Sequence, residues 1–368
     1  MALKAVAQVY PTTCLWRKMN HYCTYFDRGY LVQGMALWLS LKRHDPSAVM
    51  WVLCLDEAAG EAVRRLGEAD LRVVTLAELE GGDPELAAVK PNRSRVEYYF
   101  TLSPCLPRWL LQQQPEIEVI TYIDADMAVF SDPEPLFAEL GANHVLIVEH
   151  RFPGFLRFCE SRGRFNVGVL CFRNSAEGRR CLDWWRAQCL AWCYDRIEDG
   201  KYADQKYLDE FPRLFSGVVV CQHPGVNLAP WNWMNYRYRF ATDQLLVDGR
   251  ALIVYHFALF KPRGRFLFNS GQIEYGVMTL RLRSWLYGRY FAWLEEARRK
   301  VAVLTPGQPQ RAARGRPTTW QTLLLELIFG SVWLRVGSLW ISGRCGMGSF
   351  SGRVLVWTRR KLKRTLAS

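Results

Sequence analysis

The chain has 368 residues, of which 50% are hydrophobic and 14% aromatic. This composition excludes disorder as the main state and is enough for one large domain plus an extension. The net charge of +13 comes from one end, because residues 281–368 hold 17 Lys/Arg and three Asp/Glu. The net positive charge of the chain therefore gives no information about the binding partner of the main domain.

The eleven cysteines are odd in number and include no C-x-x-C spacing. Several of them, such as Cys54, Cys171 and Cys221, lie in apolar segments, which favours buried free thiols in a reducing compartment over a disulfide framework. The N-terminal residues lack the apolar core of roughly 7–15 residues that a signal peptide needs. We therefore expect a cytoplasmic protein.

Predicted strands and helices alternate at the start of the chain. Residues 20–26, 49–55 and 71–75 are apolar and rich in β-formers, and helical patterns follow the first two of these segments. This alternation predicts a doubly wound sheet, in which ligands bind beyond the carboxyl ends of the strands. Asp27 and Asp56 lie at such ends, although both could equally cap the helices that follow.

Residues 81–84, Gly-Gly-Asp-Pro, indicate a loop before the next helical region. Ser94 and Glu97 form a capping-box pattern that begins a helix, and residues 104–113 are expected to form another. Arg93 and Arg95 lie near the first helix N-terminus, where a phosphate or a sugar could bind. A solvated charge cluster is an equally good interpretation.

The predicted strand at 119–123 ends on Asp124-Ala125-Asp126. Residues i and i+2 of an extended chain point to the same side, so the two carboxylates should project together, about 6–7 Å apart at Cα. Two like charges there repel unless a cation lies between them, and hard ions such as Mg²⁺ or Mn²⁺ suit oxygen ligands. A carboxylate pair that only caps a turn remains the alternative.

Further polar residues follow later strands. Asn166 and Gly168 interrupt the predicted strand at 165–172, and a glycine within a strand often marks the close approach of a backbone or a ligand. Asp204 and Gln205 begin a predicted helix. A hairpin turn at 248–249 leads to a last strand that ends on His256, with Lys261 five residues later.

The C-terminal quarter differs from the rest. A helical pattern at 272–300 ends the main domain (1–300), and 301–319 is a linker rich in Pro, Gly and Arg. The tail, 320–368, begins with an apolar stretch at 320–341 whose pattern suggests a helix lying on an anionic membrane surface, helped by the basic residues that follow. The alternative is a helix that packs on the main domain.

Taken together, these motifs resemble the GT-A-fold nucleotide-sugar glycosyltransferases, most of all the glycogenin and galactosyltransferase type (glycosyltransferase family 8). The resemblance covers about residues 20–262 and depends on YIDADMAVFSDP, FNVGVL, ADQKYL and HFALFKP. It implies an α/β, GT-A (Rossmann-like) fold, with a mixed, mainly parallel sheet flanked by helices. The charge and apolar pattern of the C-terminal quarter add a C-terminal helical basic extension to this fold.

The resemblance also implies roles for residues. Asp124, Asp126 and His256 would hold Mn²⁺ or Mg²⁺, with Asp124 also near the ribose. The other implied contacts are to the donor: Thr24 and Tyr25 near the base, Arg93 or Arg95 from a helix, Asn166 and Gly168 at the sugar, Asp204 and Gln205 at the reacting face, and Lys261 at the diphosphate.

The chain departs from those relatives after His256. They have a glycine three residues after the histidine and a lysine six residues after it, whereas this chain has Leu259 and Lys261. No tryptophan follows Pro262. The diphosphate contact of Lys261 is therefore the implied role with the least support.

The leading hypothesis is a metal-dependent glycosyltransferase that moves a sugar from a nucleoside diphosphate donor, a UDP-sugar, to a glycan or lipid-linked acceptor. The family likeness favours retention of configuration, whereas inversion would need a base such as Asp204 or Asp195. A nucleotidyltransferase on a related fold and a non-catalytic sugar-binding relative are the alternatives. Nucleic acid is not expected as a partner, because the apolar stretch of the tail suits lipid better.

Overall fold

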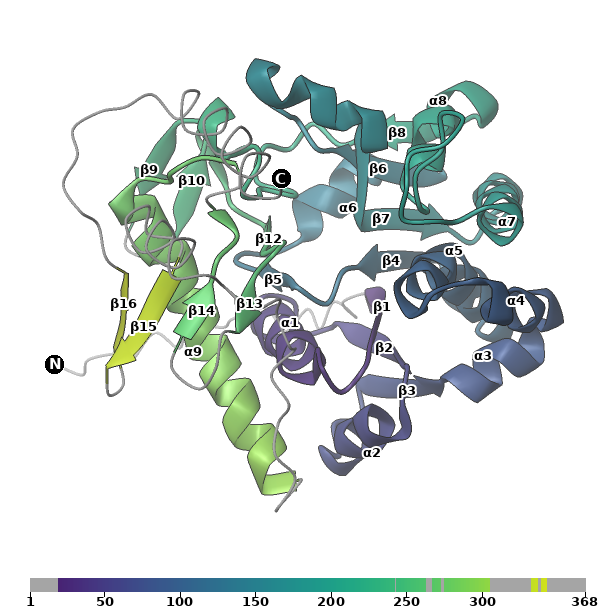
Figure 1. Ribbon diagram of the computed structural model, residues 1–368, viewed down its shortest axis with the longest axis horizontal. Coiled ribbons are helices and arrows are strands. Elements are labelled where there is room, and N and C mark those ends of the chain that lie inside the picture. The colour runs from purple at the N-terminus through teal and green to yellow at the C-terminus, as the bar shows by residue number, and fades with distance from the viewer. Residues whose placement is uncertain are drawn as a thin grey trace, which may run out of the picture.

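A seven-stranded mixed sheet forms the centre of the protein, with the order β3-β2-β1-β4-β7-β6-β8 (Figure 1). The computed structural model describes residues 19–241, 243–262, 267–272, 275–304, 332–336 and 339–342. Strand β7 runs antiparallel to its neighbours β4 and β6, and the other pairs are parallel. The predicted α/β class with a mixed, mainly parallel sheet is confirmed. The strands are β1 (His21–Phe26), β2 (Val49–Cys54), β3 (Leu71–Thr75), β4 (Val119–Ile123), β6 (Val145–Glu149), β7 (Phe165–Arg173) and β8 (Val218–Val220).

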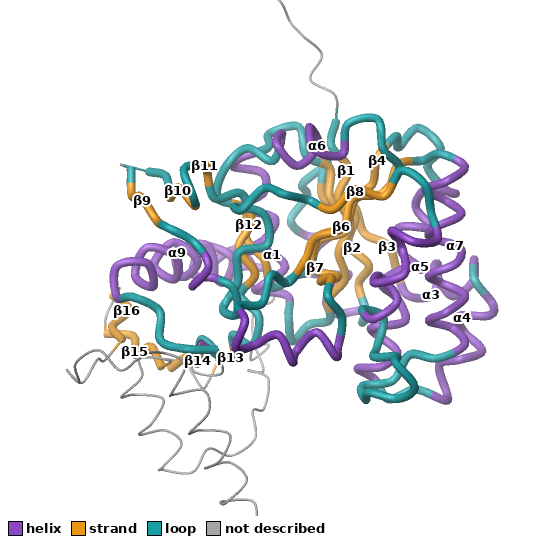
Figure 2. Tube along the Cα trace, turned by 90° about the horizontal axis from the view of Figure 1, so that it is seen from above, coloured by secondary structure: helices purple, strands orange, loops and turns teal. Residues whose placement is uncertain are grey.

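Helices cover both faces of this sheet (Figure 2). Alternate side chains of β1 point to opposite faces, so Tyr22 and Phe26 enter one hydrophobic core and Cys23 enters the other. The first core packs against α1 (Leu31–His44), α2 (Glu57–Arg65) and α9 (Leu280–Leu304). The second packs against α3 (Leu76–Gly82), α4 (Pro84–Val89), α5 (Arg95–Gln113) and α7 (Ala176–Ala191).

Shorter elements surround the sheet. Strand β5 (Met127–Val129) pairs antiparallel with β12 (Val254–His256), and this pair carries part of the candidate site. A three-stranded meander consists of β9 (Tyr238–Phe240), β10 (Leu245–Val247) and β11 (Arg250–Ala251). The remaining helical segments are α6 (Glu134–Leu140), α8 (Phe211–Leu214) and the 3-10 helices η1 (Lys90–Asn92), η2 (Gly154–Arg162), η3 (Lys206–Glu210) and η4 (Trp233–Asn235).

Two expectations between residues 81 and 113 are wrong. The Gly-Gly-Asp-Pro segment is not an extended loop, because its glycines end α3 and Asp83 caps α4 at once. The two helices expected over 94–113 are one helix, α5, which continues through Pro104 and Pro107. The buried apolar face of α5 against α7 outweighs the backbone hydrogen bonds that the prolines remove.

The membrane-surface helix expected over 320–341 is wrong where that stretch is described. Strands β15 (Val332–Val336) and β16 (Leu339–Ser342) pair with each other, and β15 also pairs with β14 (Leu267–Asn269), next to β13 (Lys261–Pro262). Val, Ile and Trp on either side of a Gly-Ser dipeptide favour a hairpin over a helix. The rest of the expected linker and tail, 305–331 and 343–368, lies outside the described residues. Within the described ranges, no helix has the length and apolar character needed to cross a membrane.

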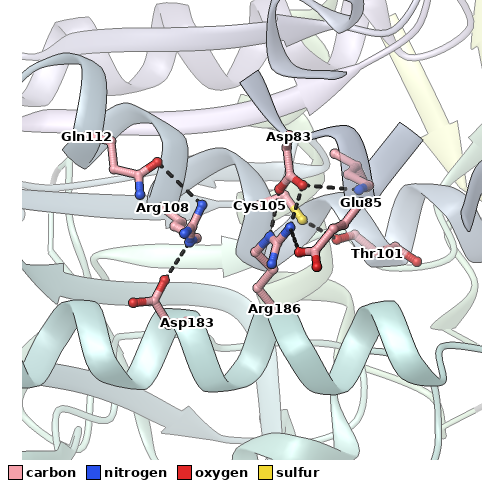
Figure 3. Close-up of polar contacts among 9 residues, drawn as sticks. Asp83, Glu85, Thr101, Cys105, Arg108, Gln112, Asp183 and Arg186 are labelled. Carbon is pink, nitrogen blue, oxygen red and sulfur yellow. Dashed lines mark hydrogen bonds and ion pairs between the residues drawn. The ribbon is translucent and has the colours of Figure 1, made fainter. Parts of the chain in front are cut away.

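Ion pairs join the helices on one face of the sheet (Figure 3). Asp83, which is 4% exposed, accepts the backbone N–H of Leu86 and is paired with Arg186 of α7. Arg186 also contacts Glu85 at 2.7 Å. Burial opposes ionisation of Asp83, but the hydrogen bonds from Arg186 hold its pKa below the usual value. Arg186 is thus the main partner of a buried carboxylate.

Arg186→Ala is expected to lower the free energy of unfolding by about 3–5 kcal/mol, because it leaves the Asp83 carboxylate buried without its partner. Urea denaturation measures this loss. The difference from the wild type should shrink as the pH falls below the ordinary aspartate value of 3.8, since the lowered pKa of Asp83 stabilises the fold only while the carboxylate is ionised. The control is Arg180→Ala on the same helix, where the exposed pair with Glu177 contributes about 1 kcal/mol or less. Equal losses in both variants would contradict the role of Arg186.

Candidate metal and nucleotide-sugar site

The two carboxylates of Asp124-Ala125-Asp126 lie directly beyond the carboxyl end of β4. Backbone hydrogen bonds fix this segment: Asp124 N–H donates to the Gly168 carbonyl at 3.0 Å. The Asp126 carbonyl accepts the N–H of Phe257 at 2.9 Å. Because β12 pairs with β5 in the register that places His256 opposite Met127, the imidazole arrives beside the carboxylates.

The three side chains form a compact cluster. His256 Nε2 lies 3.1 Å from Asp126 Oδ1 and 3.9 Å from Asp124 Oδ2, and the three potential ligand atoms all lie within 4.8 Å of one another. Ligands about 2.1 Å from a shared octahedral ion would be about 3.0–4.2 Å apart, so the spacing suits one cation. Two carboxylate oxygens and an imidazole nitrogen suit Mn²⁺ or Mg²⁺. The cluster could therefore hold a divalent metal ion.

The electrostatics of the cluster favour a cation. Burial raises the pKa of Asp124 to about 6, an effect that His256 opposes and Asp126 increases. Burial disfavours a charged His256 ring, but Asp126 and Asp124 together raise its pKa above the usual value. Tyr122 donates its hydroxyl to Asp124 Oδ1 at 2.8 Å. Negative charge therefore accumulates here at an energetic cost that a bound cation would reduce.

Strand β7 brings Asn166 and Gly168 against the cluster. Its antiparallel pairing with β4 places Val169 opposite Ile123, so the next pair along is Gly168 and Asp124. A Cβ atom at position 168 would lie 2.2 Å from Met127 Cε, 2.6 Å from Asn166 Oδ1 and 3.0 Å from His256 Nδ1. Glycine is required because three side chains meet above its backbone.

Asp204 and Gln205 reach the same region from the segment before η3. Asp204 is buried, and burial raises its pKa to about 7, an effect that the Ser103 hydroxyl opposes and Asp124 increases. Gln205 uses both ends of its amide: Oε1 accepts from Asn166 Nδ2 at 3.2 Å, and Nε2 donates to the Arg162 carbonyl at 3.1 Å. Both residues thus border the cluster, Asp204 as a carboxyl group with a raised pKa and Gln205 as a neutral amide with both ends hydrogen-bonded.

The end of β1 borders the same region. Tyr25 packs its ring against Tyr99 and Tyr122, and its hydroxyl lies 3.3 Å from Ser103 Oγ. Thr24 is buried, and its hydroxyl has no partner within the part of the chain that the structure describes. These contacts place Tyr25 next to Tyr122, the neighbour of Asp124.

The two arginines of the 93–95 segment separate. Arg95 is paired with Asp27, which follows β1 and also accepts from Tyr99 at 3.4 Å. Arg93 instead donates to the Leu190 carbonyl at 3.0 Å and lies over the Tyr194 ring, at the end of α7. Arg95 is therefore the one that contacts the end of β1.

Asp56, the other strand-end aspartate, serves as a cap. Its side chain accepts the N–H of Ala59 at 2.8 Å in the first turn of α2 and the N–H of Arg28 at 3.0 Å. The Ala59 contact is the cap that the alternative interpretation expected, and the Arg28 contact joins the end of β2 to the segment after β1.

The segment after His256 contains a non-glycine residue with a positive φ angle. Leu259 has φ of 64°, in the left-handed region that glycine adopts freely and other residues rarely enter. The backbone conformation that a glycine would favour is thus present although the residue is leucine. Lys261 follows on β13 with an exposed side chain.

His150 is a residue of this region that the sequence did not single out. It follows the carboxyl end of β6, and its ring is buried between Phe152 and Trp231. Asn166 Nδ2 lies 3.3 Å from His150 Nε2. Its position after a predicted strand was the available signal, but its partner on β7 was not evident from the sequence.

No family model matches the chain. Among solved structures, the galactosyltransferase LgtC in complex with donor and acceptor sugar analogs is 17% identical, with 76% of this chain and 99% of that chain covered and a TM-score of 0.46. Mouse xyloside xylosyltransferase 1 is 16% identical, with 65% and 98% covered and a TM-score of 0.42. The glycosyltransferase GlyE of Streptococcus pneumoniae TIGR4 is 18% identical, with 76% and 63% covered and a TM-score of 0.44. Each of these three proteins is a glycosyltransferase.

Two curated proteins of Bacillus subtilis (strain 168) are closer in sequence. The uncharacterized protein YfnF is 32% identical over 245 residues, which is 64% of this chain and 80% of YfnF. The uncharacterized protein YfnD is 32% identical over 243 residues, which is 65% of this chain and 78% of YfnD. The chain belongs to the family of YfnF and YfnD.

Proposed function

We propose that this protein is a metal-dependent glycosyltransferase that moves a sugar from a nucleoside diphosphate donor, a UDP-sugar, to a glycan or lipid-linked acceptor. The observation that carries the proposal is the cluster of Asp124, Asp126 and His256 at the carboxyl end of β4. Asn166, Gly168 and Asp204 border this cluster, which supports a sugar site beside the metal.

The proposed chemistry follows from the charge that develops during glycosyl transfer. The leaving diphosphate gains negative charge as the bond to the sugar breaks. A divalent cation held by Asp124, Asp126 and His256 would supply Lewis-acid stabilisation of that leaving group. Lys261, exposed on β13, is proposed to contact the same diphosphate.

The remaining donor contacts are proposed from their places around the cluster. Thr24 and Tyr25 at the end of β1 would lie near the base, and Arg95 would reach the donor. The proposed stereochemical course is retention, in which the leaving phosphate assists deprotonation of the acceptor. Asp204, with its pKa raised to about 7, and Gln205 would then border the reacting face of the sugar rather than act as a strong base.

The proposed setting is the cytoplasmic face of a membrane, with an anionic lipid surface contacted by 320–368. The basic residues near the C-terminus support this contact. Residues 332–336 and 339–342 are strands, so the proposed contact depends on charge attraction and not on an amphipathic helix there.

Asp126→Asn is expected to abolish hydrolysis and transfer of UDP-sugars, because it removes one of two carboxylates from the proposed metal site. A thermal-shift screen of nucleotides with and without Mn²⁺ tests the donor class, since ligand binding raises the melting temperature. The wild type should be stabilised by UDP only with metal, and Asp126→Asn should not be.

Asp56→Asn is the matched control, because asparagine caps a helix as well as aspartate does. It should retain the metal-dependent shift. A wild type that responds to nucleoside triphosphates but to no diphosphate or nucleotide sugar would overturn the proposal in favour of nucleotidyl transfer.

Gly168→Ala is expected to weaken Mn²⁺ binding by about tenfold or more, because the new methyl group would enter the space between Asn166 Oδ1 and His256 Nδ1. Isothermal titration with Mn²⁺ measures the affinity. Gly154→Ala is the control, since among the described residues no atom beyond its two chain neighbours lies within 4 Å of the added methyl group. Unchanged affinity in Gly168→Ala would argue against a metal at this position.

A further inference from the structure

A chain of hydrogen bonds connects the buried His150 to His256. His150 Nε2 lies 3.3 Å from Asn166 Nδ2, and Asn166 Oδ1 lies 3.3 Å from His256 Nδ1. Asn166 is 6% exposed, as are both histidines. The chain therefore reaches the candidate metal ligand from the side opposite to Asp126.

Fixed backbone groups decide which atoms donate along this chain. The N–H of Gly168 lies 3.1 Å from Asn166 Oδ1, so that atom must be the amide oxygen. The carbonyl of Arg162 accepts from Gln205 Nε2, which leaves Gln205 Oε1 to accept from Asn166 Nδ2. Two independent contacts thus give the Asn166 amide the same orientation.

A backbone carbonyl also determines which ring nitrogen of His150 carries the proton. Its Nδ1 lies 3.2 Å from the Arg164 carbonyl, which can only accept, so Nδ1 carries the proton. Burial lowers the pKa of His150 to about 3, so the ring is neutral and Nε2 is an acceptor. That acceptor faces Asn166 Nδ2. All four hydrogen-bonding positions of the Asn166 amide are then occupied.

The orientation of the Asn166 amide determines the tautomer of His256. Because Asn166 Oδ1 can only accept, His256 Nδ1 must carry a proton, and a neutral ring then has its lone pair on Nε2, the atom nearest the carboxylates. A metal-binding histidine needs this tautomer, in which the other ring nitrogen donates to a neighbouring group. The opposite tautomer would put the Nδ1 lone pair against the Asn166 oxygen.

We propose that His150 is a positioning residue that acts through Asn166 to keep His256 in the Nδ1–H tautomer, with Nε2 available to a divalent cation. The inference rests on the proposed metal role of His256. The ring of His150 stacks on Phe152, with 4.6 Å between ring centroids. Its backbone carbonyl accepts hydrogen bonds from Trp231 Nε1 and Asn232 Nδ2, which fix the main chain at this position. His150 adds a third constraint on the Asn166 amide, beside Gly168 N–H and Gln205 Oε1, because a rotated amide would place its oxygen against the Nε2 lone pair.

His150→Phe tests the proposal, because it keeps an aromatic ring but removes the acceptor. Mn²⁺ affinity, measured from the free-ion signal in electron paramagnetic resonance, should fall by about 10–100-fold. His150→Gln, whose amide oxygen can replace Nε2 as acceptor, should stay within about threefold of the wild type. Phe152→Leu, which removes the stacking partner alone, should behave like His150→Gln. Wild-type affinity in His150→Phe, or an equal loss in His150→Gln, would overturn the proposal.

The tautomer itself gives a readout that does not depend on metal. Histidine-selective ¹⁵N NMR of the metal-free protein, titrated until His256 is neutral, should show Nδ1–H in the wild type and a growing share of Nε2–H in His150→Phe. An Nε2–H tautomer in the wild type would refute the role of His150. A wild type with the Nδ1–H tautomer that binds no Mn²⁺ would instead refute the proposed function and leave the role of His150 standing.

Discussion

The carboxylates of Asp124 and Asp126 share a partly buried space, and the cost of keeping both ionised there governs the arrangement around them. Two neighbouring groups reduce that cost: the Tyr122 hydroxyl donates to Asp124, and the His256 ring faces both carboxylates. A protein gains nothing for its stability by collecting like charges at a strand end, since the same fold would tolerate neutral residues there. A divalent cation held by the three side chains would offset this cost.

The antiparallel direction of β7 brings a second set of polar residues to this site. In a wholly parallel sheet the neighbour of β4 would present its carboxyl end at the same edge, whereas β7 presents its beginning, so Asn166 and Gly168 arrive beside Asp124. The absence of a side chain at 168 then lets Asn166 and His256 approach each other. The polar contacts of Asn166 therefore depend on strand direction and on one glycine.

The sequence predicted the elements whose apolar pattern is local, and it failed where partners lie far apart in the chain. Strands β1 to β4 and helices α1 and α2 follow from alternation of apolar segments, and the DAD segment followed from its place at a strand end. The unbroken helix through Pro104 and Pro107 was missed because packing outweighs local propensity there. Strands β15 and β16 were missed because the apolar residues of 320–341 also have a helical spacing, which favours a helix until the strand pairing is known. The partnership of His150 with Asn166 could not be predicted, because a buried histidine has no sequence pattern and the bond crosses from β6 to β7.

The pairing of β5 with β12 has a consequence for how the protein is made and opened. Asp124 and Asp126 leave the ribosome long before His256, so the carboxylates stay without the imidazole until β12 has been synthesised and has added to β5. The same short ladder is the connection that local unfolding would have to break to release His256. An ion bound by His256 of β12 and by the carboxylates that directly precede β5 would oppose that opening, so metal supply would also set how long β5 and β12 stay paired.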